Sequence, residues 1–198
     1  MAGMKQFDEN RALDGAMKVF WQNGFSATSY PELMEATGLN KSSLYNTFGD
    51  KQALYRRCLE RFAEIHGEKL RMRLNAQRLE EAIGGFFDEL IDRFRRPDLP
   101  GGCMLTAAAL ELGADDVTAG PCIRDQMRAL EGLFRQRLDR AVREGELAGN
   151  TDTLSLASFL LAMTRGLAAL NRGYGDVRAV MRAKRSMMRI LLAPPLKR

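Results

Sequence analysis

The chain has 198 residues, of which 45% are hydrophobic and 28% are charged, and its 30 basic and 25 acidic residues give a net charge of +5. This composition is typical of globular proteins and excludes a disordered or collagen-like chain. Uninterrupted apolar runs such as 159–163 are far shorter than the roughly 20 residues that a membrane-spanning helix needs. We therefore expect no contact with a membrane.

The N-terminal segment 1–10 is polar and mixed in charge, so it does not resemble a secretory signal. The three cysteines are an odd number without the spacing of a zinc site, which favours a reducing compartment. These two observations predict a cytoplasmic protein.

Helix-forming residues dominate, and no alternating strand pattern occurs, so the predicted fold is all-α. A first helix is expected from Phe7 to Gln22, followed by Asn23-Gly24 as a stop signal. After Asp50, which can cap a helix, a long fourth helix should run into the 70s. Further helices are expected over 79–95, 103–112, 121–143, 152–171 and 177–192.

Two short helices lie between the first and the fourth. Ser29 can cap the earlier one, and Glu32 three residues later completes a capping box. Gly38 ends this helix, and Asn40 can cap the next, which runs to Phe48. The spacing is that of a helix-turn-helix, a motif whose second helix can enter the major groove of DNA but which also occurs as simple packing.

Residues 24–29 (GFSATS) and 36–54 (ATGLNKSSLYNTFGDKQAL) closely resemble the N-terminal signature of the TetR family of bacterial transcriptional regulators. The resemblance covers about the first quarter of the chain, and the chain departs from the usual pattern at Pro31. It implies a three-helix DNA-binding domain over 1–51, linked through a helix at about 51–75 to a helical ligand-binding and dimerisation domain over 76–198. It also implies a homodimer, a palindromic double-stranded DNA operator, an unknown small-molecule inducer and repression as the default.

The resemblance places Lys41 and Ser42 where family members touch base edges, and a lysine can donate to guanine. Tyr45 could reach a thymine methyl group or a phosphate, or could pack in the core instead. Leu44 and Phe48 should face the core. The predicted DNA-binding residues are Ser29, Tyr30, Lys41, Ser42, Ser43, Tyr45, Thr47 and Lys51.

The charge of the DNA-binding segment gives little support by itself. Residues 1–51 hold five basic and six acidic side chains, so the segment is near neutral. Arg56, Arg57 and Arg61 follow it and could extend a positive surface.

The last two predicted helices, about 152–171 and 177–192, carry more apolar surface than one chain can cover, so we expect them to form a four-helix bundle between two subunits. Aromatic and sulfur-containing side chains of the body could line an inducer pocket, although such residues more often form the core. The predicted ligand-binding or sensing residues are Cys103, Phe87, Met127, Phe159 and Met163.

Cys103 follows two glycines at the expected start of a helix, where the helix dipole lowers the pKa of a thiol, and Cys122 is placed similarly. The alternative is an inert buried thiol. His66 has no neighbouring ligand set for a metal, no cofactor motif occurs and no catalytic motif is present, so we expect neither a metal site nor an enzyme. The competing hypothesis is a helical ligand- or partner-binding protein without sequence-specific DNA binding.

Overall fold

A computed structural model describes residues 8–192, and this range forms nine α-helices and no strand, as predicted. The helices are α1 (Glu9–Asn23), α2 (Tyr30–Thr37), α3 (Lys41–Phe48), α4 (Lys51–Arg73), α5 (Leu79–Phe94), α6 (Met104–Glu111), α7 (Ala119–Arg143), α8 (Thr153–Tyr174) and α9 (Val177–Leu191).

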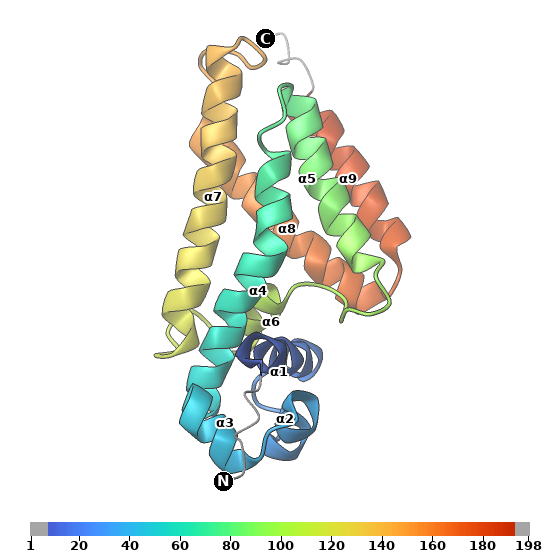
Figure 1. Cartoon of the computed structure of the whole chain (residues 1–198). Coiled ribbons are helices and arrows are strands. Elements are labelled where there is room, and N and C mark those ends of the chain that lie inside the picture. Colours follow the sequence, from blue (N-terminus) through green and yellow to red (C-terminus); the bar gives the residue numbers. More distant parts are fainter. Residues whose placement is uncertain (1–7, 193–198) are drawn as a thin grey trace.

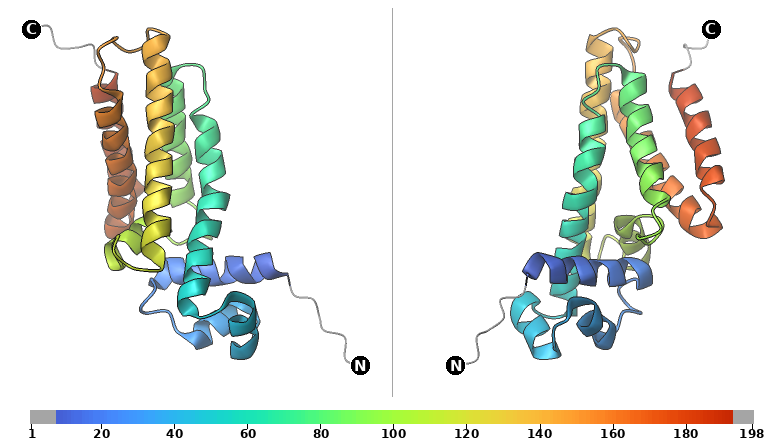
Figure 2. Two further views of the ribbon diagram at one scale, coloured as in Figure 1. Left: turned by 90° about the vertical axis from the view of Figure 1, so that its left-hand side faces the viewer. Right: turned by 45° about the vertical axis from the view of Figure 1, so that its right-hand side comes forward.

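The helices form a small head and a long body. Helices α1 to α3 make the head at one end of the molecule, and α4 runs from the head into the body (Figure 1). Helices α5, α7, α8 and α9 extend away from the head, and the short α6 lies between the head and these long helices (Figure 2). The chain therefore has two helical parts that share α4.

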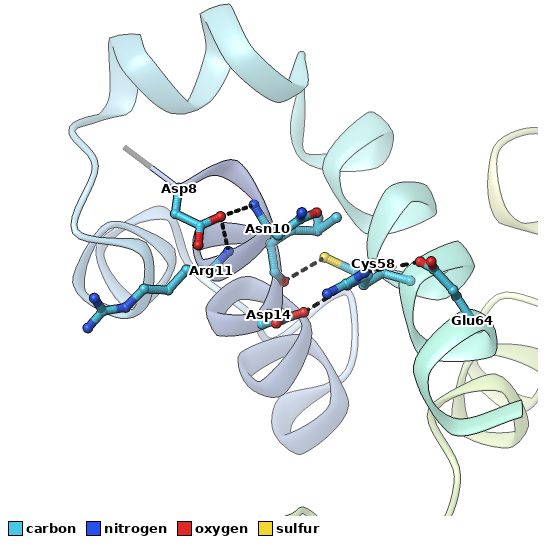
Figure 3. Close-up of polar contacts among 8 residues, drawn as sticks. Asp8, Asn10, Arg11, Asp14, Cys58 and Glu64 are labelled. Carbon is cyan, nitrogen blue, oxygen red and sulfur yellow. Dashed lines mark hydrogen bonds and ion pairs between the residues drawn. The ribbon is translucent and has the colours of Figure 1, made fainter. Parts of the chain in front are cut away.

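Side-chain caps begin the helices of the head; the caps of α2 and α3 are as predicted, whereas α1 begins after Asp8 and not at the expected Phe7. Asp8 accepts hydrogen bonds from the backbone of Asn10 and Arg11 at the start of α1, at 3.0 and 3.2 Å (Figure 3). Ser29 and Glu32 form the predicted capping box of α2. Each cap satisfies an N–H group that an isolated helix end would leave without a partner.

Polar contacts hold α4 against α1 along the boundary between head and body. The guanidinium of Arg61 donates to Asp14 on α1 at 3.0 Å and to Glu64 on its own helix at 3.1 Å (Figure 3). One turn earlier, the thiol of Cys58 lies 3.9 Å from the carbonyl oxygen of Leu13 (Figure 3). These contacts fix the angle at which α4 leaves the head.

The buried side chains form two clusters, and α4 contributes to both. The first cluster contains Phe20, Trp21 and Phe62. It is formed by side chains of helices α1, α2, α3 and α4 together with α6 and the beginning of α7. The second contains Leu70 of α4 and Phe134 of α7, with side chains of α5, α8 and α9. The hydrophobic packing of the head is therefore continuous with α6 and does not stop at the end of α3.

Two helices of the body have ends that differ from the predicted ones. Helix α7 begins at Ala119, before the expected Pro121, because the Asp116 carboxylate accepts hydrogen bonds from the N–H groups of Thr118 and Ala119 at 2.9 and 2.6 Å. Helix α8 continues to Tyr174, beyond the expected residue 171. The additional turn of α8 contains Arg172, which contacts the head.

Gly15 is the point of closest approach between α1 and α2. A Cβ atom at this position would lie 2.3 Å from the carbonyl oxygen of Ala36 on α2, which is inside van der Waals contact with backbone. We expect Gly15→Ala to lower the free energy of unfolding by about 1–3 kcal/mol, as overpacking does. Urea denaturation followed by circular dichroism measures the change.

Gly132→Ala is the matched control for this substitution. Gly132 is an exposed residue within α7, and a Cβ atom there would meet nothing within 4 Å. Alanine should therefore raise the free energy of unfolding by roughly 0.5–1 kcal/mol, because glycine weakens helix interiors. Equal effects of the two substitutions would contradict the close packing at Gly15.

Candidate functional site

The helix-turn-helix forms as the sequence predicts. Gly38 ends α2 in the left-handed conformation with φ of 69°, which favours glycine. Asn40 then begins α3, and its side-chain oxygen accepts a hydrogen bond from the Ser43 N–H at 2.8 Å. The Asn40 side chain is therefore used to cap the helix and satisfies one of the N–H groups of its first turn.

Helix α3 has one buried face and one exposed face. Leu44 and Phe48 are buried, as predicted. Lys41 and Ser42 are exposed, and Tyr45 keeps 61% of its surface accessible, so the alternative in which Tyr45 packs in the core is wrong. The outer face of α3 thus presents a cation, a hydroxyl group and a phenol close together in the first half of the helix.

The remaining predicted DNA-binding residues surround this face. The Lys41 ammonium lies 4.9 Å from the centre of the Tyr30 ring, so the starts of α2 and α3 are close together. The Lys51 ammonium lies 4.7 Å from the centre of the Phe25 ring, at the start of α4. Tyr30, Ser43, Thr47 and Lys51 are half-buried, and Ser29 is exposed.

Two of the three arginines after α3 are engaged within the protein. Arg57 pairs with Glu9 at 2.5 Å, and Arg61 pairs with Asp14 at 3.0 Å. Both therefore hold α1 on α4, and they do not extend a free positive surface as expected from the sequence. Arg56 is exposed.

Two side chains that the sequence reasoning missed connect the body to the head. Glu111, the last residue of α6, accepts hydrogen bonds from the backbone N–H groups of Phe25 at 2.8 Å and Ser26 at 2.7 Å. Burial raises the pKa of Glu111, but these two N–H groups outweigh burial and hold it below its usual value. The carboxylate of α6 thus fixes the loop between α1 and α2.

Arg172 makes the second connection, from the last turn of α8. Its guanidinium donates to the carbonyl oxygens of Gln22 at 2.7 Å and Trp21 at 3.3 Å, at the end of α1. It also donates to the carbonyl oxygen of Gly101 at 3.3 Å. Arg172 therefore ties α1 both to α8 and to the segment before α6.

A cavity of about 80 Å³ lies in the body beside α4. Helices α4 to α8 and the residue preceding α6 contribute side chains to its lining, which includes Phe62, His66, Arg93, Cys103, Leu130 and Arg165.

Of the five predicted pocket residues, the structure places only Cys103 in this lining. Phe87 is fully buried against Phe86, with ring centres 5.2 Å apart. Met127 packs against the first hydrophobic cluster, and Phe159 and Met163 pack against the second. Large apolar side chains at helical spacing serve the core here, which is their commoner role.

The thiol of Cys103 has a positively charged environment. Cys103 is the N-cap residue of α6, and Arg165 on α8 donates a hydrogen bond to its Sγ at 3.3 Å. Burial alone raises the pKa of Cys103, but the guanidinium groups of Arg165 and Arg93 outweigh burial and lower it below the usual thiol value. This thiol therefore ionises more readily than an ordinary cysteine.

The other two cysteines differ from Cys103. Burial raises the pKa of Cys122 to about 11, with added repulsion from Glu60 and Asp125. Burial also raises the pKa of Cys58 far above the usual thiol value. The prediction that Cys122 resembles Cys103 is therefore wrong: Cys122 lies near the start of α7, but burial and two carboxylates raise its pKa instead of lowering it.

His66 lines the same cavity, where its ring lies against Trp21 and Phe62 with centres 5.3 and 4.8 Å away. Burial, together with the positive charges of Arg93 and Arg96, lowers its pKa to about 4, so the imidazole is neutral at pH 7. Within residues 8–192, no cluster of three or more histidine, cysteine or acidic side chains could hold a metal ion.

Family models match both parts of the chain. Residues 12–58 match the model of bacterial regulatory proteins of the tetR family. Residues 76–187 match the model of the tetracyclin repressor-like C-terminal domain. The chain belongs to the TetR family. It is a DNA-binding transcriptional regulator, built from a helix-turn-helix domain and a C-terminal helical domain.

Relatives of this TetR-family chain match over most of its length. The transcriptional repressor ComR of Escherichia coli K12 is 29% identical over 188 residues, which are 94% of this chain and 90% of ComR. The uncharacterized transcriptional regulator YezE of Bacillus subtilis 168 is 32% identical over 81% of this chain and 84% of YezE. A solved structure of a cysteine mutant of the TetR family regulator CifR with 26-bp operator DNA has a TM-score of 0.87 and 29% identity, covering 94% of this chain and 98% of that chain.

The environment of Cys103 gives a measurable pH dependence. Because the thiolate is the form that reacts, alkylation of Cys103 by iodoacetamide should reach half its maximal rate at a lower pH than a free cysteine does. Arg165→Gln should move this midpoint upward. Mass spectrometry of labelled peptides over a pH series measures each cysteine separately.

Cys122 is the internal reference in the same experiment, since its pKa is raised to about 11. It should remain largely unlabelled at pH 7. A Cys103 midpoint at or above that of free cysteine would contradict the role of the two arginines.

Proposed function

We propose that this TetR-family protein is a cytoplasmic homodimeric repressor that binds a palindromic operator and is released by a small-molecule or electrophilic signal. The observation that carries the proposal is the exposed face of α3, where Lys41, Ser42 and Tyr45 lie outside the core. Its relatives include a repressor, ComR, and a regulator solved with operator DNA, CifR. The activity is binding, and no catalytic step is involved.

Each residue of the proposed DNA interface has a role that follows from its chemistry. Lys41 would donate to guanine O6 or N7, and Tyr45 would meet a thymine methyl group or a phosphate. The hydroxyl groups around α3 and the Lys51 ammonium would contact the phosphate backbone and set the position of α3 in the major groove. The backbone-contacting set is Ser29, Tyr30, Ser43, Thr47 and Lys51.

The dimer would form through α8 and α9. Only 28% of the most apolar 18-residue window of α8 is buried within one chain, although the mean hydropathy of this window is 1.5. By length and composition alone α8 could also cross a membrane, but Arg165 and Arg172 on this helix are engaged with Cys103 and with α1. A second copy of the chain can cover the remaining apolar face.

The symmetry of such a dimer determines the DNA site. Two copies of α3 related by a twofold axis would reach major grooves about one helical turn, or a multiple of it, apart. A ligand could bind better to a dimer in which the two α3 helices have a different spacing. It would then lower the affinity for DNA by the difference between its binding free energies for the two dimer geometries.

Cys103 is the proposed contact point for electrophiles. The Cys103 thiolate could add to the β-carbon of an α,β-unsaturated carbonyl compound that enters the cavity. One S–C bond forms as the C=C π bond breaks, and the α-carbon takes a proton from water. The new substituent would occupy space at the start of α6, whose other end holds the loop between α1 and α2 through Glu111. Displacement of α6 would therefore reach the head.

Lys41→Ala tests the DNA interface. We expect about 10-fold or greater loss of affinity for the operator and weaker discrimination against altered sites, because a lysine–guanine contact contributes roughly 1–3 kcal/mol. Fluorescence anisotropy with DNA from upstream of the protein's own gene measures both effects. Lys69→Ala is the matched control, since Lys69 is exposed on α4 and lies outside the proposed interface.

Absence of sequence-specific binding by the unaltered protein at low salt would instead support the competing hypothesis of a helical ligand- or partner-binding protein. Equal losses in Lys41→Ala and Lys69→Ala would show a general charge effect and not base recognition.

Ala162→Arg tests the dimer. Ala162 is exposed on α8 in the single chain, and a charged side chain there would be desolvated in the proposed interface without a partner. We expect sedimentation to show a shift from dimer to monomer and a parallel loss of operator binding. Met72→Arg, which changes a 59% exposed apolar residue of α4, should leave the dimer intact. A monomeric unaltered protein would exclude the proposed assembly.

A further inference from the structure

The cavity beside Cys103 carries positive charge that the surrounding side chains do not neutralise. Arg93 and Arg165 both line it, and neither forms an ion pair within residues 8–192. The Nε atom of each guanidinium is buried and has no hydrogen-bond partner in this part of the chain. Buried cationic donors without partners are costly, so their retention points to a ligand.

The carboxylates near the cavity are engaged elsewhere. Glu89 accepts a hydrogen bond from Arg73 at 2.9 Å, and Asp92 pairs with Arg95 at 3.2 Å. No aspartate or glutamate of the described chain lines the cavity. Among the lining residues, only the Cys103 thiolate could supply a negative charge. One such charge cannot compensate the guanidinium groups of Arg93 and Arg165, and Arg71 adds a third guanidinium to the lining.

Packing explains the position of the Arg93 guanidinium, but it does not provide a hydrogen-bond partner for its Nε–H group. Its guanidinium lies over the rings of Phe62 and Phe94, at 5.5 and 5.9 Å from their centres. Such cation–π contacts hold the face of the guanidinium and leave the N–H edge available. Arg165 likewise uses one nitrogen on Cys103 and leaves Nε without a partner.

The size and walls of the cavity limit what can neutralise this charge. Its volume of about 80 Å³ suits a small ligand. Phe62, Leu90 and Leu130 supply apolar side chains to the same lining. A ligand that satisfies both features has one planar anionic group and a short apolar body.

We propose that the cavity is a binding site for small organic carboxylates, with the carboxylate held between Arg93 and Arg165 and the hydrocarbon part against Phe62 and Leu90. Carboxylate matches guanidinium in geometry and can accept two parallel hydrogen bonds from it. The binding of a carboxylate to the cavity is independent of the proposed function. Its action as the inducer rests on the proposed function.

Propionate and propionamide are a matched pair of probes, because they have five non-hydrogen atoms each and differ in charge. Isothermal titration calorimetry with the full-length protein should detect saturable binding of propionate and at least about 10-fold weaker binding of propionamide, since hydrogen bonds to charged groups are the stronger ones. Equal affinities, or no binding of propionate at tens of millimolar, would overturn the proposal.

Substitutions locate the site. Arg93→Gln and Arg165→Gln should each weaken propionate binding by about 10-fold or more. Arg95→Gln is the matched control, since Arg95 directly follows the last residue of α5, is exposed and pairs with Asp92. Arg93→Lys retains the positive charge and serves as a second variant in case Arg93→Gln does not fold. It should bind propionate more tightly than Arg93→Gln. Unchanged affinity in both cavity variants would refute the site.

Cys103→Ser and DNA binding complete the test. Because the thiolate competes for Arg165, Cys103→Ser should bind propionate as tightly as the unaltered protein or more tightly, and a loss of binding would contradict the proposed arrangement. Operator binding with and without propionate is measured separately by anisotropy. If propionate binds but does not release the DNA, the carboxylate site stands and its role as the inducer site is excluded. Loss of DNA binding in Lys41→Ala tests only the DNA interface.

Discussion

The arrangement of the molecule depends on α4, which is shared by the two hydrophobic clusters. Its first half packs with α1 through Phe62 and its last turns pack with α5 and α7 through Leu70. Between these residues His66 and Gly67 face the cavity. Because a single helix cannot shift at one end without moving the other, the head cannot change its angle independently of the side chains that line the cavity.

Helix α6 supplies a second connection, and its two ends have different chemistry. The residue before its first turn, Cys103, faces two cations in the cavity, whereas its last residue, Glu111, holds the backbone of the α1–α2 loop. Charged hydrogen bonds of this kind contribute about 1.5–3 kcal/mol when desolvated, and the exposure of Glu111 places it at or below the lower end. That amount holds the loop in the resting state and is small enough for a bound ligand to overcome.

Much of the fold follows from local signals, and the parts that do not follow are long-range. Capping residues such as Ser29, Asn40 and Asp50 determine where helices begin, and they can be read from adjacent positions. The exposed face of α3 follows from helical periodicity in the same way. In contrast, Glu111 reaches residues 86 and 85 positions earlier, and Arg165 reaches Cys103 across 62 positions. Nothing near these residues in the sequence marks their partners, so the sequence identified the cysteine but not the arginines that change its pKa.

The same guanidinium connects the two kinds of signal considered for this regulator. In the resting state Arg165 donates to the sulfur of Cys103, at the start of α6. An electrophile that reacts with the thiolate removes the negative charge from that sulfur, and a carboxylate in the cavity competes with the thiolate for the same donor. Either event weakens one contact between α8 and α6, and α8 also holds the end of α1 through Arg172. A chemically reactive compound and an unreactive anion would therefore act on the head through a common change, the release of the Cys103 sulfur from Arg165.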